Sequence, residues 1–277
     1  MNHVEGTFKG VRGLDIYHQA WIPEGDVRAA VLFVHGLGEH CGRYTNVVDK
    51  LVPMGYALYG FDLPGHGKSE GVREYVDKYD DYTETLTAIY HRVREAQPDR
   101  PIFLLGHSMG GLIASAYLID HSDAFTGAVI SAPAILIPDF VTKFTVLAGK
   151  VLSKIAPKAG ILGLDANGVS KDPAVVQAYI NDPLVFHGKT TARLSAELLD
   201  KVFWVNERLE KITTPLLIVH GSDDKLANPK ASQLLYDQAS SKDKTLKIYE
   251  GLYHEVFNEP EHQEVLGEVA AWLEAHL

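Results

Sequence analysis

Short, continuous apolar runs alternate with amphipathic helical patterns along most of the chain, and this alternation limits the possible folds more than any other feature. Runs predicted as strands cover 29–35, 56–62, 101–107, 127–131, 215–220 and 245–250. A strand that is apolar along its whole length has both faces buried, as in a parallel sheet covered by helices. Between two of these runs Tyr82, Leu86, Ile89 and Val93 recur at helical spacing, and 263–273 shows a similar pattern. The sequence therefore predicts an α/β fold with a mostly parallel central sheet flanked by helices.

Two segments depart from this alternation. Residues 7–23 predict a β-hairpin around a glycine-containing turn at 10–13. Residues 134–211 show helical patterns and turns but no convincing strand. We therefore expect a core formed by 1–133 and 212–277, with a helical cap inserted between two strands of the sheet as 134–211.

Composition excludes several classes of protein. The chain has 277 residues, one cysteine and a formal net charge of −10. An acidic chain lacks the basic surface that nucleic acids require, so we expect no nucleic-acid partner. A single cysteine permits neither an intramolecular disulfide nor a cysteine metal cluster, which favours a reducing, cytoplasmic location. No run approaches the roughly 18 apolar residues of a membrane span, and the first residues lack the pattern of a signal peptide.

The segment Gly106-His107-Ser108-Met109-Gly110 places a serine in a turn flanked by glycines. The turn follows an apolar run and precedes a helical pattern, which is the strand–turn–helix context of a nucleophile elbow. In such an elbow the glycines permit a tight turn, and the serine oxygen is exposed at the carboxyl edge of the sheet. The short motif alone is common, but its context predicts that Ser108 is a nucleophile.

A serine nucleophile needs a general base, and the base needs a carboxylate that fixes its tautomer. In this topology the acid and then the histidine follow the serine, each on a loop after a strand. The loop after the fifth predicted strand contains Asp223 and Asp224, and spacing alone does not choose between them, because either could cap the next turn. The loop after the sixth strand contains His254, which is a better candidate than His262 because His262 lies in the last helical pattern.

The turn Gly36-Leu37-Gly38 follows the first predicted strand and leaves backbone amides free. An oxyanion hole of this topology uses one N–H from that loop and one from the residue after the nucleophile. We therefore expect the N–H groups of Leu37 and Met109 to form it.

Two further motifs fail because a required residue is missing. Segment 64–71 resembles the end of a phosphate-binding loop, but Asp62 stands where its first glycine is required. The histidine–glutamate pair at 254–255 resembles the start of a zinc helix, but Asn258 stands where the second histidine is required. Cys41 has no evident base and is interpreted as a small buried residue rather than a second nucleophile. We expect no metal and no other cofactor.

Over nearly its whole length the chain resembles the monoacylglycerol lipase branch of the serine α/β-hydrolases. The motifs that carry the resemblance are HGLGEHCGRY (35–44), DLPGHGKSEG (62–71), GHSMGG (106–111), SAPAI (131–135), YINDPL (179–184), HGSDDKL (220–226) and DKTLKIYEGLYHE (243–255). The serine motif marks only the superfamily, whereas the first and last motifs are more selective. The resemblance implies the α/β-hydrolase fold and cofactor-free hydrolysis of a monoacylglycerol, or a similar single-chain lipid ester, to a fatty acid and glycerol.

The resemblance also assigns individual residues. Asp224 matches the acid of the family's catalytic triad, and Tyr179 matches a cap tyrosine near the lipid head group. Glu39 and Arg43 match a polar segment beside the glycerol end of the pocket, although they could instead pair with each other and brace the loop. An acyl chain needs an apolar channel, for which the candidates are Ile135, Leu136, Ile137, Phe140, Leu147 and Val151.

One predicted cap helix carries an apolar stripe with lysines mostly beside it. The stripe consists of Phe140, Phe144, Leu147, Val151 and Ile155, and the lysines are Lys143, Lys150, Lys154 and Lys158. Such a helix is either an ordinary surface helix with a solvated lysine face or an element that makes peripheral contact with a membrane.

Four alternative functions remain compatible with the sequence. The same fold could serve a lysophospholipase or a general carboxylesterase, or it could transfer the acyl group to a nucleophile other than water. A noncatalytic lipid-binding protein of this fold is a remote alternative, because such a protein would be expected to have lost a member of the triad. No pattern in the sequence indicates an oligomeric state.

Overall fold

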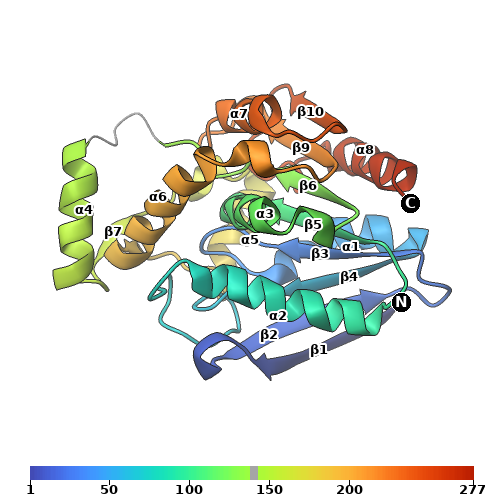
Figure 1. Ribbon diagram of the computed structural model, residues 1–277, viewed down its shortest axis with the longest axis horizontal. Coiled ribbons are helices and arrows are strands. Elements are labelled where there is room, and N and C mark those ends of the chain that lie inside the picture. The colour runs from blue at the N-terminus through green and yellow to red at the C-terminus, as the bar shows by residue number, and fades with distance from the viewer. Residues whose placement is uncertain (138–142) are drawn as a thin grey trace.

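The computed structural model describes residues 1–137 and 143–277, apart from the side chains of 143–145. Its centre is an eight-stranded sheet in which β1 and β2 are antiparallel to their neighbours and all other strands are parallel (Figure 1). In spatial order the strands are β1 (Asn2–Lys9), β2 (Asp15–Ile22), β4 (Tyr56–Phe61), β3 (Ala29–Val34), β5 (Ile102–His107), β6 (Gly127–Ser131), β9 (Leu216–Gly221) and β10 (Lys244–Tyr249). The predicted mostly parallel sheet and the amino-terminal hairpin are thus confirmed.

The apolar runs form strands because helices cover both faces of the sheet. Alternate residues of β3 enter two separate clusters, Ala30, Leu32 and Val34 on one face and Ala29, Val31 and Phe33 on the other. The first face packs against α2 (Asp80–Ala96), α3 (Met109–Asp120) and α7 (Lys230–Gln238). The second face packs against α1 (Thr45–Leu51) and α8 (His262–Ala275).

The last strand departs from the expectation of full burial. β10 lies at the edge of the sheet, and its residues are partly or largely exposed. An edge strand has a neighbour on one side only, so the apolar character of its sequence overstated its burial.

The chain between β6 and β9 leaves the sheet, and we call this segment the insertion. Its elements are α4 (Lys143–Ile155), β7 (Gly160–Leu162), α5 (Pro173–Asn181), β8 (Thr190–Thr191) and α6 (Ala192–Asn206). β7 and β8 pair antiparallel, which corrects the prediction that this segment contains no strand. Both strands are too short for their periodicity to be detected in the sequence. Figure 1 shows α4 beside α6 at the edge of the molecule, on the side away from both chain ends.

The parallel strands all present their carboxyl ends at one edge of the sheet. The loops that follow β3, β5, β9 and β10 therefore meet there, beneath the insertion. None of the helices in the described part of the chain is long and apolar enough to span a membrane.

Candidate active site

Ser108 lies on a strained turn between β5 and α3. Its backbone has φ 55° and ψ −117°, and residues other than glycine rarely adopt a positive φ. Gly110 lets the start of α3 pack very closely on the sheet, since a Cβ atom added there would lie 2.1 Å from the carbonyl oxygen of Val34. The Ser108 N–H donates to the carbonyl of Ser131 at 2.9 Å, which ties the turn to β6. This geometry is that of a nucleophile elbow.

His254 and Asp224 are in direct contact across the loops after β10 and β9. The Nδ1 atom of His254 lies 2.6 Å from Oδ2 of Asp224. The other carboxylate oxygen of Asp224 accepts the backbone N–H groups of Leu226 at 2.7 Å and Ala227 at 2.9 Å. Asp223 is exposed, so the structure places Asp224, and not its neighbour, beside the histidine. His262 lies at the start of α8, where Nδ1 hydrogen-bonds with the carbonyl of Glu259.

A second histidine, His220, also binds Asp224, and sequence reasoning did not single it out. Its Nε2 atom donates to Oδ2 of Asp224 at 3.0 Å, and its Nδ1 accepts the hydroxyl of Ser232 at 2.7 Å. The signal that could have found it is a histidine at the end of a buried strand, four residues before the candidate acid. His220 helps to fix the carboxylate on which the orientation of His254 depends.

The electrostatics of this pair favour a charged carboxylate and a basic histidine. Burial alone would raise the pKa of Asp224, but the charge of His254 and the hydrogen bonds of His220 and His254 hold it well below its usual value. Burial opposes protonation of His254, yet the adjacent Asp224 carboxylate outweighs burial and raises the pKa of His254. A carboxylate that stabilises the imidazolium in this way is what a general base needs.

His107, directly before the candidate nucleophile, packs against the candidate base. Its ring centroid lies 4.7 Å from that of His254, with the planes inclined by 53°. Burial lowers the pKa of His107 to about 3, so the ring is neutral and adds no charge next to His254. Its Nδ1 hydrogen-bonds with the hydroxyl of Ser131 at 3.1 Å. His107 thus forms a rigid, uncharged support for the loop after β10 that carries His254.

The two N–H groups predicted to form the oxyanion hole are available. Among the residues that the structure describes, neither the Leu37 N–H nor the Met109 N–H donates to a protein acceptor. Both residues line the same cavity as Ser108. The neighbouring N–H of Gly36 is held by Oε1 of Glu39 at 2.6 Å, which fixes the start of this loop.

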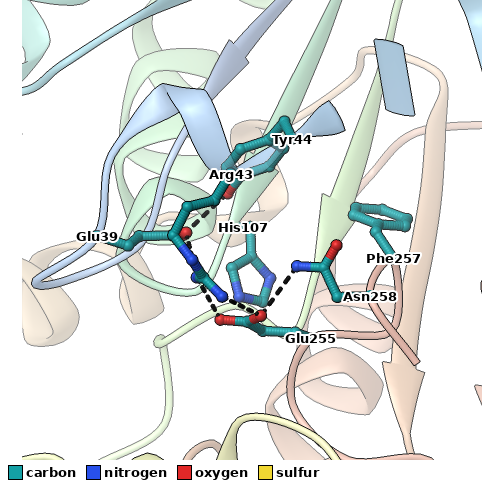
Figure 2. A pocket seen from close by; sticks show the side chains of 7 residues that line it. All are labelled: Glu39, Arg43, Tyr44, His107, Glu255, Phe257 and Asn258. Carbon is teal, nitrogen blue, oxygen red and sulfur yellow. Dashed lines mark hydrogen bonds and ion pairs between the residues drawn. The ribbon is translucent and has the colours of Figure 1, made fainter. Parts of the chain in front are cut away.

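Glu39 and Arg43 belong to a buried cluster of charged residues beside the loop that carries His254 (Figure 2). Arg43 contacts Glu39 at 2.8 Å and Glu255 at 2.6 Å, and Figure 2 shows its guanidinium between the two carboxylates. Arg43 does not border the large cavity described below, whereas Glu39 lies where the cluster and that cavity meet. The arrangement favours the bracing role that the sequence left open over direct substrate binding by Arg43.

A cavity of about 920 Å³ opens over Ser108 between the core and the insertion. Ser108, Asp224 and His254 all line it, together with Leu37 and Met109. Its apolar wall is formed by Leu112, Leu136, Ile137, Val146, Leu198, Leu199 and Val202. Its polar lining residues include Tyr179 and Thr190. A large cavity with a mostly apolar surface suits a ligand with one hydrocarbon chain.

The structure divides the predicted channel residues into three groups. Leu136 and Ile137 line the cavity, but Ile135 is fully buried in the core cluster behind it. Leu147 and Val151 were wrongly predicted to line it: their side chains are 62% and 51% exposed, because this face of α4 points to solvent. Phe140 lies outside the described residues.

Cys41 is buried, and its thiol accepts the side-chain amide of Gln19. Burial raises the pKa of the thiol well above its ordinary value, which makes it a poor nucleophile. Within the described ranges, no group of three or more His, Cys, Asp or Glu side chains has the arrangement of a metal site.

The chain is similar to several known proteins in sequence and in fold. A family model described as serine aminopeptidase, S33, matches residues 25–261. A monoacylglycerol lipase of Mycolicibacterium smegmatis is 40% identical over 273 residues, which cover 99% of this chain and 98% of that protein. The crystal structure of Paleococcus ferrophilus monoacylglycerol lipase superposes with a TM-score of 0.83 at 32% identity and covers 100% of both chains. A Saccharomyces cerevisiae monoglyceride lipase in complex with a substrate analog gives a TM-score of 0.84 at 26% identity, covering 98% of this chain and 94% of that one.

Proposed function

The chain belongs to the serine aminopeptidase S33 family, within its monoacylglycerol lipase branch, and from this premise we propose that it hydrolyses monoacylglycerols to a fatty acid and glycerol. It is a carboxylic ester hydrolase with the α/β-hydrolase fold. The observation that carries the proposal is that Ser108 and the hydrogen-bonded pair of His254 and Asp224 line the same large, mostly apolar cavity. In this proposal residues 134–211, which contain the insertion, form the cap. Residues 1–133 and 212–277 form the catalytic core.

The reaction proceeds through an acyl-enzyme. Because Nδ1 of His254 is bound to Asp224, Nε2 is the nitrogen that accepts the hydroxyl proton as Ser108 Oγ attacks the ester carbonyl. The tetrahedral oxyanion accepts hydrogen bonds from the N–H groups of Leu37 and Met109. His254 then returns the proton to the glycerol oxygen as the ester bond breaks.

Hydrolysis of the acyl-enzyme repeats these steps with water. His254 accepts a proton from the water as its oxygen attacks the acyl carbonyl, and then gives it to Ser108 as the fatty acid leaves. Asp224 stays ionised throughout, consistent with its lowered pKa.

The cavity supports a single-chain substrate. The apolar wall that runs from Leu112 in the core to Leu198 and Val202 in the cap can accommodate one acyl chain. Tyr179 offers a hydroxyl group to the glycerol, whereas the hydroxyl of Thr190 donates to Glu74 and can only accept a hydrogen bond from the glycerol. Burial of the chain contributes about 0.8 kcal/mol per methylene, so a long chain is bound far more strongly than an acetyl group.

Peripheral contact with a membrane is part of the same proposal. The outer face of α4 exposes Leu147, Val151 and Ile155, and the last of these is 76% exposed. Ile161 and Leu162 of β7 and the nearby Leu164 are also exposed, and they border the cavity itself. An apolar face of this kind, flanked by lysines, is typical of helices that lie in a lipid interface. It would bring the mouth of the cavity to a surface that contains the substrate.

A substrate panel tests the proposed function. Glycerol and fatty-acid release would be measured on monoacylglycerols of graded length, lysophosphatidylcholine, a diacylglycerol and p-nitrophenyl esters of short acids. The proposal predicts the highest kcat/KM on a long-chain monoacylglycerol. Higher kcat/KM on lysophosphatidylcholine would make the enzyme a lysophospholipase, and activity on short esters alone would make it a general carboxylesterase.

A further inference from the structure

We propose that Arg43 is a positioning residue that holds two loops in a fixed relative position. One is the loop after β3 that carries Leu37, here called the oxyanion loop, which Arg43 contacts through Glu39. The other is the loop after β10 that carries His254, here called the histidine loop, which it contacts through Glu255. The inference rests on the proposed function, because it assigns a task within the same ester hydrolysis. Figure 2 shows the arrangement: the Arg43 guanidinium lies between the two carboxylates, with His107 facing the same small space.

The contact with Glu255 is bidentate. Nη1 of Arg43 lies 2.6 Å from Oε1 of Glu255, and Nη2 lies 2.7 Å from Oε2. The side chains of Arg43 and Glu255 are 10% and 6% exposed. A planar guanidinium that binds both oxygens of a carboxylate fixes its orientation as well as its distance. Because the surroundings exclude most water, this pair is held much more firmly than a surface ion pair.

Glu255 transmits this constraint to the candidate base, since it directly follows His254 in the chain. Its Oε2 also accepts the side-chain amide of Asn258 at 2.9 Å, and its backbone N–H donates to the carbonyl of Val169 at 2.8 Å. Both the side chain and the backbone of Glu255 are therefore held in place. Because His254 is the adjacent residue, a displacement of Glu255 must also displace His254.

Glu39 transmits the constraint to the oxyanion loop. Its Oε2 contacts Arg43 at 2.8 Å, while its Oε1 accepts the backbone N–H of Gly36 and the hydroxyl of Tyr44 at 3.0 Å. Gly36 directly precedes Leu37, whose N–H is the proposed oxyanion donor. Glu39, fixed by Arg43, therefore holds the His35–Gly36 peptide, directly before the peptide that carries the Leu37 N–H. The Gly36–Leu37 peptide is held in turn by a hydrogen bond between its carbonyl oxygen and Nδ1 of His35 at 2.7 Å.

Arg43 also contacts the cap. Its guanidinium lies over the ring of Tyr179, with 4.6 Å between Cζ and the ring centroid. Tyr179 lines the large cavity, so the same cation joins both catalytic loops to the substrate-facing wall. The oxyanion donor, the base and the wall depend on one side chain that does not itself line the cavity.

The network also surrounds His254 with charge, which provides a readout besides rate. The charged or titratable groups near it are Asp224 and Lys225 after β9, Glu39 and Arg43 after β3, His107 at the end of β5, and Glu255 on its own loop. Burial opposes protonation of His254, whereas Asp224, Glu255 and Glu39 raise its pKa. Removing the charge of Glu255 is therefore expected to lower the pKa of His254.

Three variants test the inference on a short, soluble p-nitrophenyl ester, which needs neither a membrane nor a long chain. Arg43→Met removes the lock and is expected to lower kcat on the order of 10²-fold with KM within about twofold, since a small misplacement of catalytic groups has an effect of this size. Arg43→Lys keeps the charge but loses bidentate geometry and is expected to lower kcat roughly tenfold. Glu255→Gln is expected to lower kcat and to move the acid limb of the pH profile to lower pH.

The matched control is a second bidentate pair far from the site. Nη1 and Nη2 of Arg28 bind the two carboxylate oxygens of Glu274 at 2.8 and 2.7 Å, but on the surface. Arg28→Met and Glu274→Gln are expected to leave kcat and the pH profile unchanged. Thermal unfolding of every variant checks the fold, and Arg43→Lys carries the test if Arg43→Met does not fold.

Two results would overturn the inference: a wild-type kcat in the Arg43 variants, or an unshifted acid limb in Glu255→Gln. A fall in kcat that the control pair reproduces would also overturn it, because the effect would then be a general loss of stability. Failure of the proposed function gives a different result, since wild-type enzyme that hydrolyses the short ester but no monoacylglycerol still reports on Arg43.

Discussion

The two walls of the cavity differ in how they are built. The core wall holds Ser108, Asp224 and His254 on loops that follow parallel strands of the sheet, and hydrogen bonds constrain each loop. The cap wall consists of apolar side chains on α6 and neighbouring segments, and its outer helix α4 exposes large apolar residues. In the proposed function, chemistry therefore depends on atoms fixed by the sheet, whereas substrate selection depends on the shape and area of an apolar surface. Changes in the core should affect kcat for every ester, and changes in the cap should affect only some esters.

The largest effect is expected from Ser108→Ala. Loss of the nucleophile should lower kcat on the order of 10⁴-fold or more for long and short esters alike. Thermal unfolding and binding of a nonhydrolysable long-chain ether should stay close to wild type, because the cap wall is untouched. Retention of near-normal esterase activity would break the assignment of chemistry to the core.

The pH profile tests the core wall without a substitution. His254 must be neutral to accept the proton of Ser108, and its pKa is raised above the ordinary 6.5 because the Asp224 carboxylate outweighs burial. As pH falls below this pKa, kcat/KM should fall about tenfold per pH unit, because the protonated histidine is not a base. The acid limb should have its midpoint above 6.5 for both short and long esters. A midpoint well below that value, or one that depends on chain length, would contradict this expectation.

Acyl-chain length is expected to separate the two walls. Each methylene buried against the cap should raise kcat/KM roughly fourfold, from about 0.8 kcal/mol per methylene, until the cavity is filled. Leu198→Trp fills part of the cavity and should shorten this series by several methylenes while leaving acetyl-ester turnover unchanged. Phe203→Trp on the same helix is the control, since Phe203 is exposed and does not line the cavity. An unaltered length series in Leu198→Trp would show that the chain binds elsewhere.

The smallest effect is expected on the outer face of the cap. Replacing Leu147, Val151 and Ile155 together by serine should reduce binding to vesicles in sedimentation assays several-fold. Hydrolysis of a soluble ester should stay within about twofold of wild type, since these side chains point away from the cavity. A control with serine at three exposed apolar positions of the core, Val4, Val72 and Ile248, should bind vesicles like wild type. Equal loss in both proteins, or no binding by wild type, would remove the proposed membrane contact.

The sheet was largely predictable because a parallel strand buried on both faces leaves a continuous apolar run in the sequence. β10 shows the limit of this signal: the run indicated a strand but not its position at the edge. β7 and β8 were missed, since strands of two or three residues have no measurable period. The topology in turn predicted which loops hold Ser108 and His254.

Long-range contacts were less predictable. Spacing did not choose between Asp223 and Asp224, whereas the family resemblance selected Asp224. The physical basis of this choice is the contact of Asp224 with His254, which no local sequence pattern contains. Arg43 and Glu255 are 212 positions apart in the chain, and their pairing is visible only after folding. The prediction for α4 failed for a similar reason, since its periodicity identified an apolar face but not what that face contacts.

The most direct test is a crystal structure of the enzyme after reaction with a long-chain alkyl phosphonate, which mimics the tetrahedral intermediate. The account predicts phosphorus bonded to Oγ of Ser108 and a phosphonyl oxygen about 2.7–3.1 Å from the N–H groups of Leu37 and Met109. It also predicts the alkyl chain along the cap wall formed by Leu136, Leu198 and Val202. An adduct on another residue, or an alkyl chain that leaves the cavity for solvent, would contradict it.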